Sequence, residues 1–284
     1  MTNRRDFLKS AAAFAVGAMV LPAFTSPSEK KIGLQLYSVR DEIKKDLDLT
    51  LAKLAKIGYN SAELAGFDLN KGTFYGMSPR EFAGKMKVYG LEINSSHSVF
   101  RAKDAEKVCS AAAEVGTKYL VHPCIQGEFR KDVDSYKRAA EELNKIGEVA
   151  NKYGVRFGYH NHDFEFKDLG GQKGMDILLN ETDPKLVTFE VDMYWVTKAG
   201  YNPIGYLSKF PGRFELFHVK DMTKTEDRFF APVGHGRIDF EQIFALKDKL
   251  GMKYFFVEQD SFKTLKSLQS MEMSYKYLSN ASWL

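Results

Sequence analysis

Histidines and carboxylates in this chain gather where apolar, strand-like runs end. All six histidines lie at the end of such a run or in the loop just beyond it: His97, His122, His160, His162, His218 and His235. Carboxylates occupy equivalent places: Glu63, Glu165, Asp192, Asp221 and Glu258. One histidine at a strand end is usually a hydrogen-bonded core residue, but chance does not readily explain six. Imidazoles and carboxylates together can bind a divalent metal and transfer protons.

Asp192, His218 and Glu258 are the strongest candidates for metal ligands, because each ends or nearly ends a strongly apolar run. A carboxylate buried without a partner costs several kcal/mol, so it needs a cation or an ion pair. A mixed set of carboxylates and imidazoles suits one divalent ion, Mn²⁺, Zn²⁺, Co²⁺ or Fe²⁺. The residues alone also allow structural ion pairs, in which Asp192 and His218 pair with each other or with Lys220.

The elements that must position these residues are strands alternating with helices. Eight strands are predicted at residues 32–37, 61–64, 92–96, 119–122, 156–160, 187–192, 215–219 and 254–258. Five times a helical pattern ends in glycine before such a run, at Gly58, Gly90, Gly116, Gly154 and Gly251. Glycine suits these places because a helix C-terminus often needs a left-handed residue. The alternation predicts right-handed crossovers and a parallel sheet.

The helix signals are equally regular. Residues 78–89 open with serine, then proline, then glutamate three residues after the cap, which is a capping box. Asp239 gives a similar start to a helix predicted to run to Leu250. Residues 133–153 carry apolar and alanine positions at helical spacing.

Eight strand-and-helix units predict a single (β/α)8 barrel over residues 24–284, because about 250 residues are typical of that fold. An open doubly wound sheet shows the same alternation, but the chain has no Gly-x-Gly-x-x-Gly after its first strand. In a barrel, residues at the C-terminal ends of all strands converge at one mouth. The fold therefore predicts a shared site for the residues above.

Residues 1–23 are predicted to be a twin-arginine signal peptide. Arg4 and Arg5 precede an apolar run at residues 10–21 and small residues near Ala23. The run is shorter than the roughly 20 residues that span a bilayer, so we expect cleavage, a periplasmic protein and no stable membrane anchor. The alternative is an amphipathic helix packed on the domain.

Charge and cysteine content exclude several classes of partner. The net charge is +4, and about half of it lies in the predicted signal, which argues against nucleic acid or anionic membrane as the main partner. The two cysteines, Cys109 and Cys124, form no Cys-x-x-Cys motif, so neither a disulfide framework nor a thiolate metal site is indicated. Both are predicted to be buried thiols.

The sequence resembles the xylose-isomerase-like barrel superfamily, in particular the sugar phosphate isomerase/epimerase group with its ketose 3-epimerases, inosose dehydratases and apurinic endonucleases. The resemblance covers nearly all of residues 24–284. Its most specific segments are residues 159–166, 191–195, 217–221, 234–239 and 257–258.

In ketose epimerases of this group, the residues that end strands five to eight hold the metal: glutamate, aspartate, histidine and glutamate. The resemblance places the last three on Asp192, His218 and Glu258. Strand five ends in His160, so either His160 is the fourth ligand or His162 or Glu165 reaches in from the next loop. The histidine removes one glutamate of the acid–base pair that these epimerases use.

Roles for the other residues follow from position at the mouth. Proton transfer is assigned to Glu258, His160, His162 and His97. Substrate contact is assigned to Glu63, Gln35, Tyr37, Trp195, Lys220, Glu165 and His235. Each has a structural alternative: Trp195 as a cap on the barrel, or Tyr37 and Gln35 as interior filling. Glu190 points to the same side of its strand as Asp192 but deeper, where it could orient a ligand.

The resemblance implies a metal-dependent sugar isomerase or epimerase, which deprotonates a carbon next to a carbonyl and forms a metal-stabilised enediolate. The alternative is a lyase or dehydratase that acts on a keto-sugar, such as a 3-keto-glycoside or an inosose, by β-elimination. A second alternative is a sugar-binding barrel without catalysis. An apurinic endonuclease fits poorly, because Trp195 stands where those enzymes have a histidine. The partner is a small sugar, and the family implies a homo-oligomer.

Overall fold

Eight parallel strands close into a barrel in the computed structural model, which describes residues 30–284. Around the barrel they follow the order β1-β12-β9-β8-β7-β6-β5-β2. Their bounds are β1 (Gly33–Gln35), β2 (Ser61–Leu64), β5 (Glu92–His97), β6 (Tyr119–His122), β7 (Arg156–His160), β8 (Val187–Asp192), β9 (Phe214–Val219) and β12 (Tyr254–Val257). The (β/α)8 barrel is thereby confirmed.

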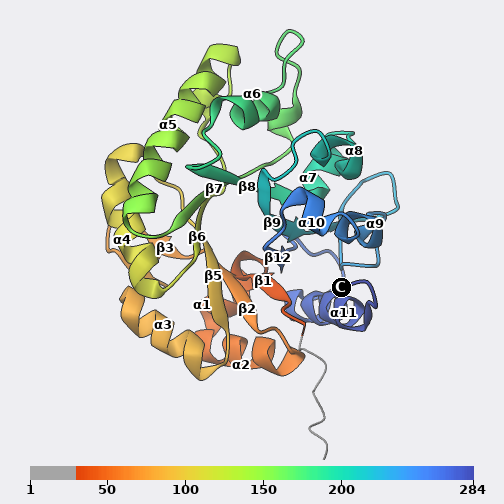
Figure 1. Ribbon diagram of the computed structural model, residues 1–284. Coiled ribbons are helices and arrows are strands. Elements are labelled where there is room, and N and C mark those ends of the chain that lie inside the picture. The colour runs from red at the N-terminus through yellow and green to blue at the C-terminus, as the bar shows by residue number, and fades with distance from the viewer. Residues whose placement is uncertain (1–29) are drawn as a thin grey trace, which may run out of the picture. The chain divides into compact units, whose positions relative to one another are not determined.

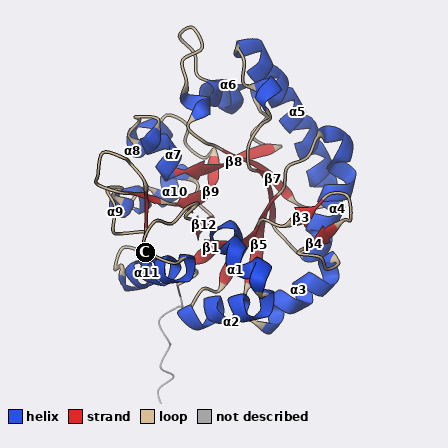
Figure 2. Cartoon of the chain, turned by 180° about the vertical axis from the view of Figure 1, so that it is seen from behind, coloured by secondary structure: helices blue, strands red, loops and turns tan. Residues whose placement is uncertain are grey.

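Helices surround the strands on the outside (Figures 1 and 2). They are α1 (Arg40–Lys45), α2 (Leu47–Ile57), α3 (Pro79–Val88), α4 (Ala105–Val115), α5 (Val133–Lys152), α6 (Gly174–Glu181), α7 (Met193–Lys198), α8 (Pro203–Leu207), α9 (Phe240–Phe244), α10 (Lys247–Leu250) and α11 (Ser267–Asn280). Two short hairpins lie in the loops: β3 (Phe67–Asp68) with β4 (Thr73–Phe74), and β10 (Asp221–Met222) with β11 (Phe230–Ala231).

Local signals in the sequence account for most of these elements. The capping box at Ser78 and Glu81 is present, with Pro79 at the first helical position. All five glycines that precede a predicted strand have positive φ, from 68° at Gly90 to 118° at Gly58. These signals set the helix ends, and every barrel strand begins within one residue of its predicted start.

Two predicted elements differ from the structure. The first strand ends at Gln35 instead of residue 37, because the Gln35 side chain accepts a hydrogen bond from Tyr37 N at 2.9 Å and starts a 3₁₀ turn. The helix predicted from Asp239 to Leu250 is two short helices, α9 and α10. Leu246 N donates to Ile243 O at 3.1 Å, three residues back, and this tighter turn interrupts the α-helical pattern.

The barrel interior changes character along its axis. Tyr119, Val121, Leu216 and Phe256 form a buried apolar cluster of their own. His218 lies two residues beyond Leu216 and faces the same side of β9. Polar residues therefore occupy the interior nearer the C-terminal strand ends, above an apolar layer.

Residues Lys31–Leu284 form one compact unit. The predicted signal peptide, residues 1–23, lies outside the described residues, so it stays a prediction, as does a single domain over 24–284. Within residues 30–284, none of the helices combines the length and apolar character needed to cross a membrane. Cys109 is a buried thiol as predicted, whereas Cys124 is only half-buried.

Candidate metal centre

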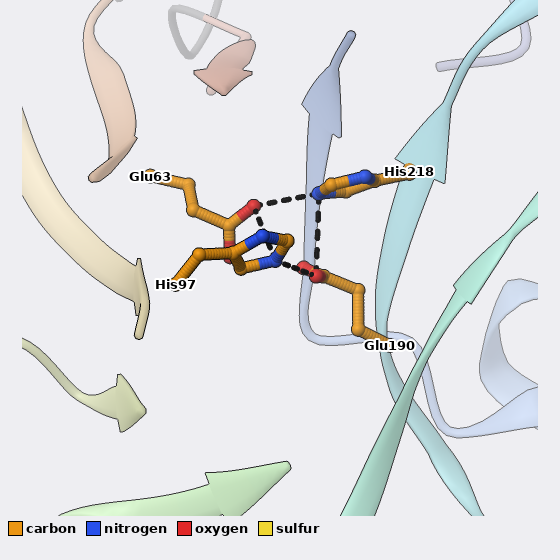
Figure 3. Close-up of side chains that lie close together, drawn as sticks. All are labelled: Glu63, His97, Glu190 and His218. Atoms are coloured by element: carbon orange, nitrogen blue, oxygen red, sulfur yellow. Dashed lines mark hydrogen bonds and ion pairs between the residues drawn. The ribbon is translucent and has the colours of Figure 1, made fainter. Parts of the chain in front are cut away.

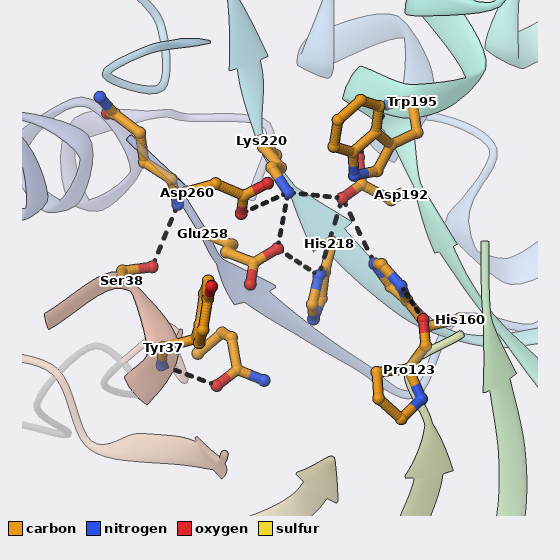
Figure 4. Close-up of polar contacts among 12 residues, drawn as sticks. Tyr37, Ser38, Pro123, His160, Asp192, Trp195, His218, Lys220, Glu258 and Asp260 are labelled. Atoms are coloured by element: carbon orange, nitrogen blue, oxygen red, sulfur yellow. Dashed lines mark hydrogen bonds and ion pairs between the residues drawn. The ribbon is translucent and has the colours of Figure 1, made fainter. Parts of the chain in front are cut away.

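Four predicted ligands come together at the C-terminal ends of four neighbouring strands (Figure 4). His160, Asp192, His218 and Glu258 are all buried, and each offers a ligand atom within 4.8 Å of the others. We call these four residues the outer cluster. His218 Nδ1 lies 2.9 Å from Glu258 Oε2, and His160 Nε2 lies 3.4 Å from Asp192 Oδ2. Of the three candidates for the fourth ligand, the structure brings His160 into this group.

Surrounding groups orient the outer cluster. Pro123 O lies 3.1 Å from His160 Nδ1, which leaves Nε2 to face Asp192. Asp192 Oδ1 accepts a hydrogen bond from Trp195 N at 3.1 Å and caps α7, so that Oδ2 points into the cluster. Such contacts fix ligand geometry in metal sites. The donor types, burial and convergence therefore fit a divalent ion.

Lys220 is a buried cation beside two of these ligands. Its Nζ lies 3.2 Å from Asp192 Oδ2, 2.9 Å from Glu258 Oε2 and 2.7 Å from Asp260 Oδ1. Burial opposes its charge, but the three carboxylates raise the Lys220 pKa well above its ordinary value. Burial likewise opposes ionisation of Asp192 and Glu258, but Lys220 holds the pKa of each below its ordinary value. Lys220 is therefore an ammonium group facing carboxylates.

A second group shares His218 with the first, and Figure 3 shows its four side chains. It comprises Glu63, His97, Glu190 and His218, which we call the inner cluster. Burial and the nearby Glu63 raise the pKa of Glu190 well above its ordinary value. Although burial opposes ionisation of Glu63, His97 and His218 lower its pKa to about 2. The inner cluster thus places one ionised carboxylate against one that favours its proton.

A cavity of about 490 Å³ opens over the outer cluster. Segments after the first four barrel strands line one side of it, including Tyr37, Phe67, Val99 and Cys124, and His162, Lys220, Asp260 and Ser261 line it from segments after the later strands. The outer cluster comes from the last four strands, β7, β8, β9 and β12. A volume of this size is within the usual range of small-molecule sites.

One predicted proton-transfer residue, His162, and three predicted substrate contacts lie at or near this cavity. His162 lines it, and burial and His160 lower its pKa to about 3, so its imidazole is neutral. Trp195 packs against His162, with ring centroids 5.3 Å apart. Tyr37 stands at the rim, 43% exposed, and Arg40 stacks on its ring at 4.1 Å. Gln35 lies deeper, where its Nε2 donates to Glu63 Oε2 at 2.7 Å.

Other predicted residues lie away from the cavity. Glu165 is fully buried, where its carboxylate accepts hydrogen bonds from Tyr159 Oη at 2.5 Å and His162 N at 2.9 Å. His235 is exposed and lines a separate surface hollow. His122 Nε2 lies 3.0 Å from Phe100 O inside the protein, which is a structural contact.

Asp221 organises the loop that carries the Gly-His-Gly segment. Its carboxylate accepts hydrogen bonds from the backbone N–H groups of Gly234, Gly236 and Ile238 at 2.8–3.1 Å. The segment therefore holds a turn together and does not supply a ligand to either cluster. Sequence reasoning missed Asp260, whose contact with Lys220 depends on a loop beyond β12.

Comparison with known proteins assigns the family. Residues 51–277 match the model of the xylose isomerase-like TIM barrel family. The chain belongs to the xylose isomerase-like TIM barrel family. The resemblance predicted from the sequence motifs is confirmed.

Two relatives are similar in sequence. Inosose dehydratase from Clostridium beijerinckii is 31% identical over 146 residues, covering 45% of this chain and 47% of the relative. The chain thus spans about half the length of this curated relative. The crystal structure of a sugar phosphate isomerase/epimerase from Parabacteroides distasonis is 28% identical, with a TM-score of 0.82, and covers 94% of this chain and 99% of that one.

One structural neighbour contains a metal. The crystal structure of the IOLI protein with a bound zinc atom aligns with a TM-score of 0.69 at 16% identity, covering 88% of this chain and 96% of that one. At this identity the likeness shows the fold alone. This chain itself carries two groups of side chains that could hold a metal ion.

Proposed function

We propose that this protein is a metal-dependent sugar isomerase or epimerase that removes a proton next to a carbonyl group and returns it to the substrate. The outer cluster carries the proposal, because four ligand-type side chains from four strands meet below an open cavity. A divalent ion bound there would polarise the substrate carbonyl. The four ligands allow Mn²⁺, Zn²⁺, Co²⁺ or Fe²⁺.

Glu258 and His162 are the proposed proton-transfer groups, because both line the cavity. Glu258 is ionised and can accept a proton from carbon. His162 is neutral and lines the cavity, and its Nδ1 has no hydrogen-bond partner among residues 30–284. Trp195 and His160 hold this imidazole by ring contacts at 5.3 and 5.0 Å.

A lyase or dehydratase acting on a keto-sugar is the second candidate, and Lys220 favours it. β-Elimination needs a base for the carbon-bound proton and an acid for the leaving oxygen. The Lys220 ammonium lies 2.9 Å from the Glu258 carboxylate, so a donor and an acceptor stand side by side. The inosose dehydratase relatives support the same chemistry for a polyhydroxylated ketone.

The reaction class can be tested in D₂O with a free ketose, an inosose and a 3-keto-glycoside. Deuterium incorporation without elimination supports the isomerase or epimerase and excludes the lyase. Release of water or of the aglycone with formation of a double bond supports the lyase. If none of the three exchanges deuterium with the metal-loaded protein, enzymatic proton abstraction is wrong and a sugar-binding barrel is favoured.

The matched variant for this experiment is Asp192→Asn, which keeps the size of the side chain but removes its charge. Asp192→Asn is expected to lose the outer metal and to exchange substrate hydrogen for deuterium at least about a hundredfold more slowly. Its circular dichroism spectrum should be unchanged. Retained metal in Asp192→Asn would show that the ligand assignment is wrong.

We also propose export to the periplasm, because residues 1–23 have the pattern of a twin-arginine signal. Phosphorylated sugars are scarce outside the cytoplasm, so this location favours an unphosphorylated substrate. N-terminal sequencing of protein recovered from the periplasm would find a chain that begins after Ala23. A full-length chain recovered only from the cytoplasm would contradict the proposal.

A further inference from the structure

The inner cluster is a closed ring of four ligand atoms inside the barrel. Around the ring, Glu63 Oε2 lies 2.6 Å from His218 Nε2, which lies 3.2 Å from Glu190 Oε2. Glu190 Oε2 lies 2.5 Å from His97 Nε2, which lies 3.2 Å from Glu63 Oε2. Oxygen and nitrogen therefore alternate, and each imidazole faces two carboxylates.

Burial leaves this ring short of compensating contacts. The side chains of Glu63, Glu190 and His218 are fully buried, and that of His97 is 10% exposed. Glu63 Oε1 and Glu190 Oε1 are also buried and have no hydrogen-bond donor within the described part of the chain. Buried carboxylate oxygens are normally satisfied, so two such atoms beside one ring leave a place for a further partner, which a bound cation would supply.

The backbone is locally irregular in β5 and β9, the two strands that carry the histidines of the ring, where Asn94 and Glu215 are extra residues opposite the strands of Glu63 and Glu190. The pairing of β2 with β5 shifts register between Ala62 and Glu63, and the pairing of β8 with β9 shifts between Phe189 and Glu190. Such β-bulges commonly redirect a side chain next to a functional site. Gln35 Nε2, at 2.7 Å from Glu63 Oε2, then fixes the orientation of that carboxylate.

We propose that Glu63, His97, Glu190 and His218 bind a second divalent cation, below the outer cluster. With metal–ligand distances of about 2.1 Å, neighbouring ligand atoms are about 3.0–3.4 Å apart. The two longer ring edges, 3.2 Å each, already fit this range, and the two shorter edges, 2.5 and 2.6 Å, need to widen by about 0.4–0.9 Å. Two carboxylates and two imidazoles match the ligand preference of Zn²⁺, Co²⁺ or Mn²⁺.

His218 links the two sites. Its Nε2 belongs to the inner ring, and its Nδ1 faces Glu258 and Asp192 of the outer cluster at 2.9 and 3.8 Å. A neutral imidazole carries one N–H, so binding through both nitrogens requires that this proton leave to solvent. Occupation of both sites thus makes His218 a bridging imidazolate, and the ions then lie close enough to interact.

The inference is tested by counting metal ions, which needs no substrate and does not depend on the reaction proposed above. Full-length protein is stripped with a chelator, titrated with Co²⁺, desalted and analysed for cobalt and for its visible spectrum. The wild-type chain is expected to bind two equivalents. Glu190→Gln and Glu63→Gln should each bind one, with the spectrum of the outer site retained.

Two further variants separate the sites. Asp192→Asn should bind one equivalent, held by the inner ring, which distinguishes failure of the outer site from failure of the inner one. Glu165→Gln changes a fully buried carboxylate that belongs to neither cluster, so it should still bind two.

Saturation of the wild-type protein at one equivalent would overturn the proposal, even if the variants fold poorly. Two equivalents retained by both Glu63→Gln and Glu190→Gln, with unchanged circular dichroism, would also overturn it, because the second ion would then lie elsewhere. The inner cluster would in that case be a proton-sharing network.

Discussion

Lys220 places a positive charge where a metal would also lie. Its ammonium is 1% exposed and contacts Oδ2 of Asp192 and Oε2 of Glu258, which are two proposed ligand oxygens. When no metal is bound, the lysine neutralises these carboxylates. When a metal is bound, the two cations repel each other. Lys220 therefore stabilises the metal-free fold and weakens metal binding.

Lys220→Met is expected to destabilise the metal-free protein by about 3 kcal/mol, because removing one partner leaves buried carboxylates uncompensated. The same change should tighten metal binding about tenfold, or about 1.4 kcal/mol, and reduce turnover. Chemical denaturation and metal competition titrations measure the two effects. Lys263→Met, which removes an exposed ion pair with Asp227, serves as the control and should change neither. Equal or weaker metal affinity in Lys220→Met would refute this account.

Glu165 gives the stability of the fold a pH dependence. Burial raises its pKa to about 7 from an ordinary value of 4.5, although Tyr159 and His162 donate hydrogen bonds to it. The folded protein thus holds this proton more tightly than the unfolded chain does. The protonated Glu165 therefore makes its full contribution to the free energy of unfolding below pH 4.5. This contribution is lost as the pH rises toward about 7, and amounts to about 3 kcal/mol.

Glu165→Gln is therefore expected to flatten the fall in unfolding free energy between about pH 4.5 and 7. At pH 5 the substitution should lower the free energy of unfolding by about 1 kcal/mol, because an amide cannot accept the hydrogen bonds of both Tyr159 and His162. Urea denaturation at a series of pH values gives both quantities. An unaltered slope would assign the pH dependence to other groups.

At the scale of elements, two glycines within helices have opposite surroundings. Gly147 lies on the buried face of α5, where an added methyl group would stand 2.7 Å from the carbonyl oxygen of Leu186. Gly84 is exposed in α3, and none of the described residues lies within 4 Å of such a methyl group. One glycine is thus required by packing, and the other only lowers helix propensity.

Gly147→Ala should lower the unfolding free energy by about 2 kcal/mol, because the backbone of Leu186 must move. Gly84→Ala should raise it by about 0.5–1 kcal/mol. Thermal denaturation of the pair compares the same chemical change in two helices. A destabilised Gly84→Ala or a stabilised Gly147→Ala would contradict the described packing.

Sequence patterns predicted the elements because their signals are local. Helix caps, glycine ends and apolar runs depend on neighbouring residues, so all eight barrel strands were predicted close to their observed ranges. The outer cluster followed from three strand ends and a family resemblance. The inner cluster was only partly foreseen, since Glu63, His97 and Glu190 were assigned separate roles. Their meeting depends on the pairing of distant strands, with extra residues in β5 and β9 opposite Glu63 and Glu190, which no local pattern reveals.

At the scale of the whole molecule, both clusters join side chains from strands far apart in the sequence. Glu63 and Glu258 lie on opposite sides of β1 in the barrel order, and His218 contacts both. A bound ion would therefore connect early and late parts of the chain, and would resist global unfolding.

Saturating metal, at about 100 times its dissociation constant, should stabilise the fold by about 2.7 kcal/mol and raise the melting temperature by roughly 5–10 °C. Differential scanning calorimetry with each of Mn²⁺, Zn²⁺, Co²⁺ and Fe²⁺, and again after chelation, would measure the shift. The double variant Asp192→Asn/Glu190→Gln should lose it. If none of the four ions changes the wild-type melting temperature, metal binding by the folded barrel is wrong.

The division of the cavity between the two halves of the barrel has an evolutionary consequence. Loops after β1, β2, β5 and β6 form one side of its wall, whereas the outer cluster and the wall residues His162, Lys220, Asp260 and Ser261 lie in the C-terminal half. Mutations in the first set of loops can reshape the wall without displacing an outer ligand. Descendants of such a barrel could acquire new sugars by changes in these N-terminal loops, while the outer cluster, whose four residues all lie in the C-terminal half, is inherited intact.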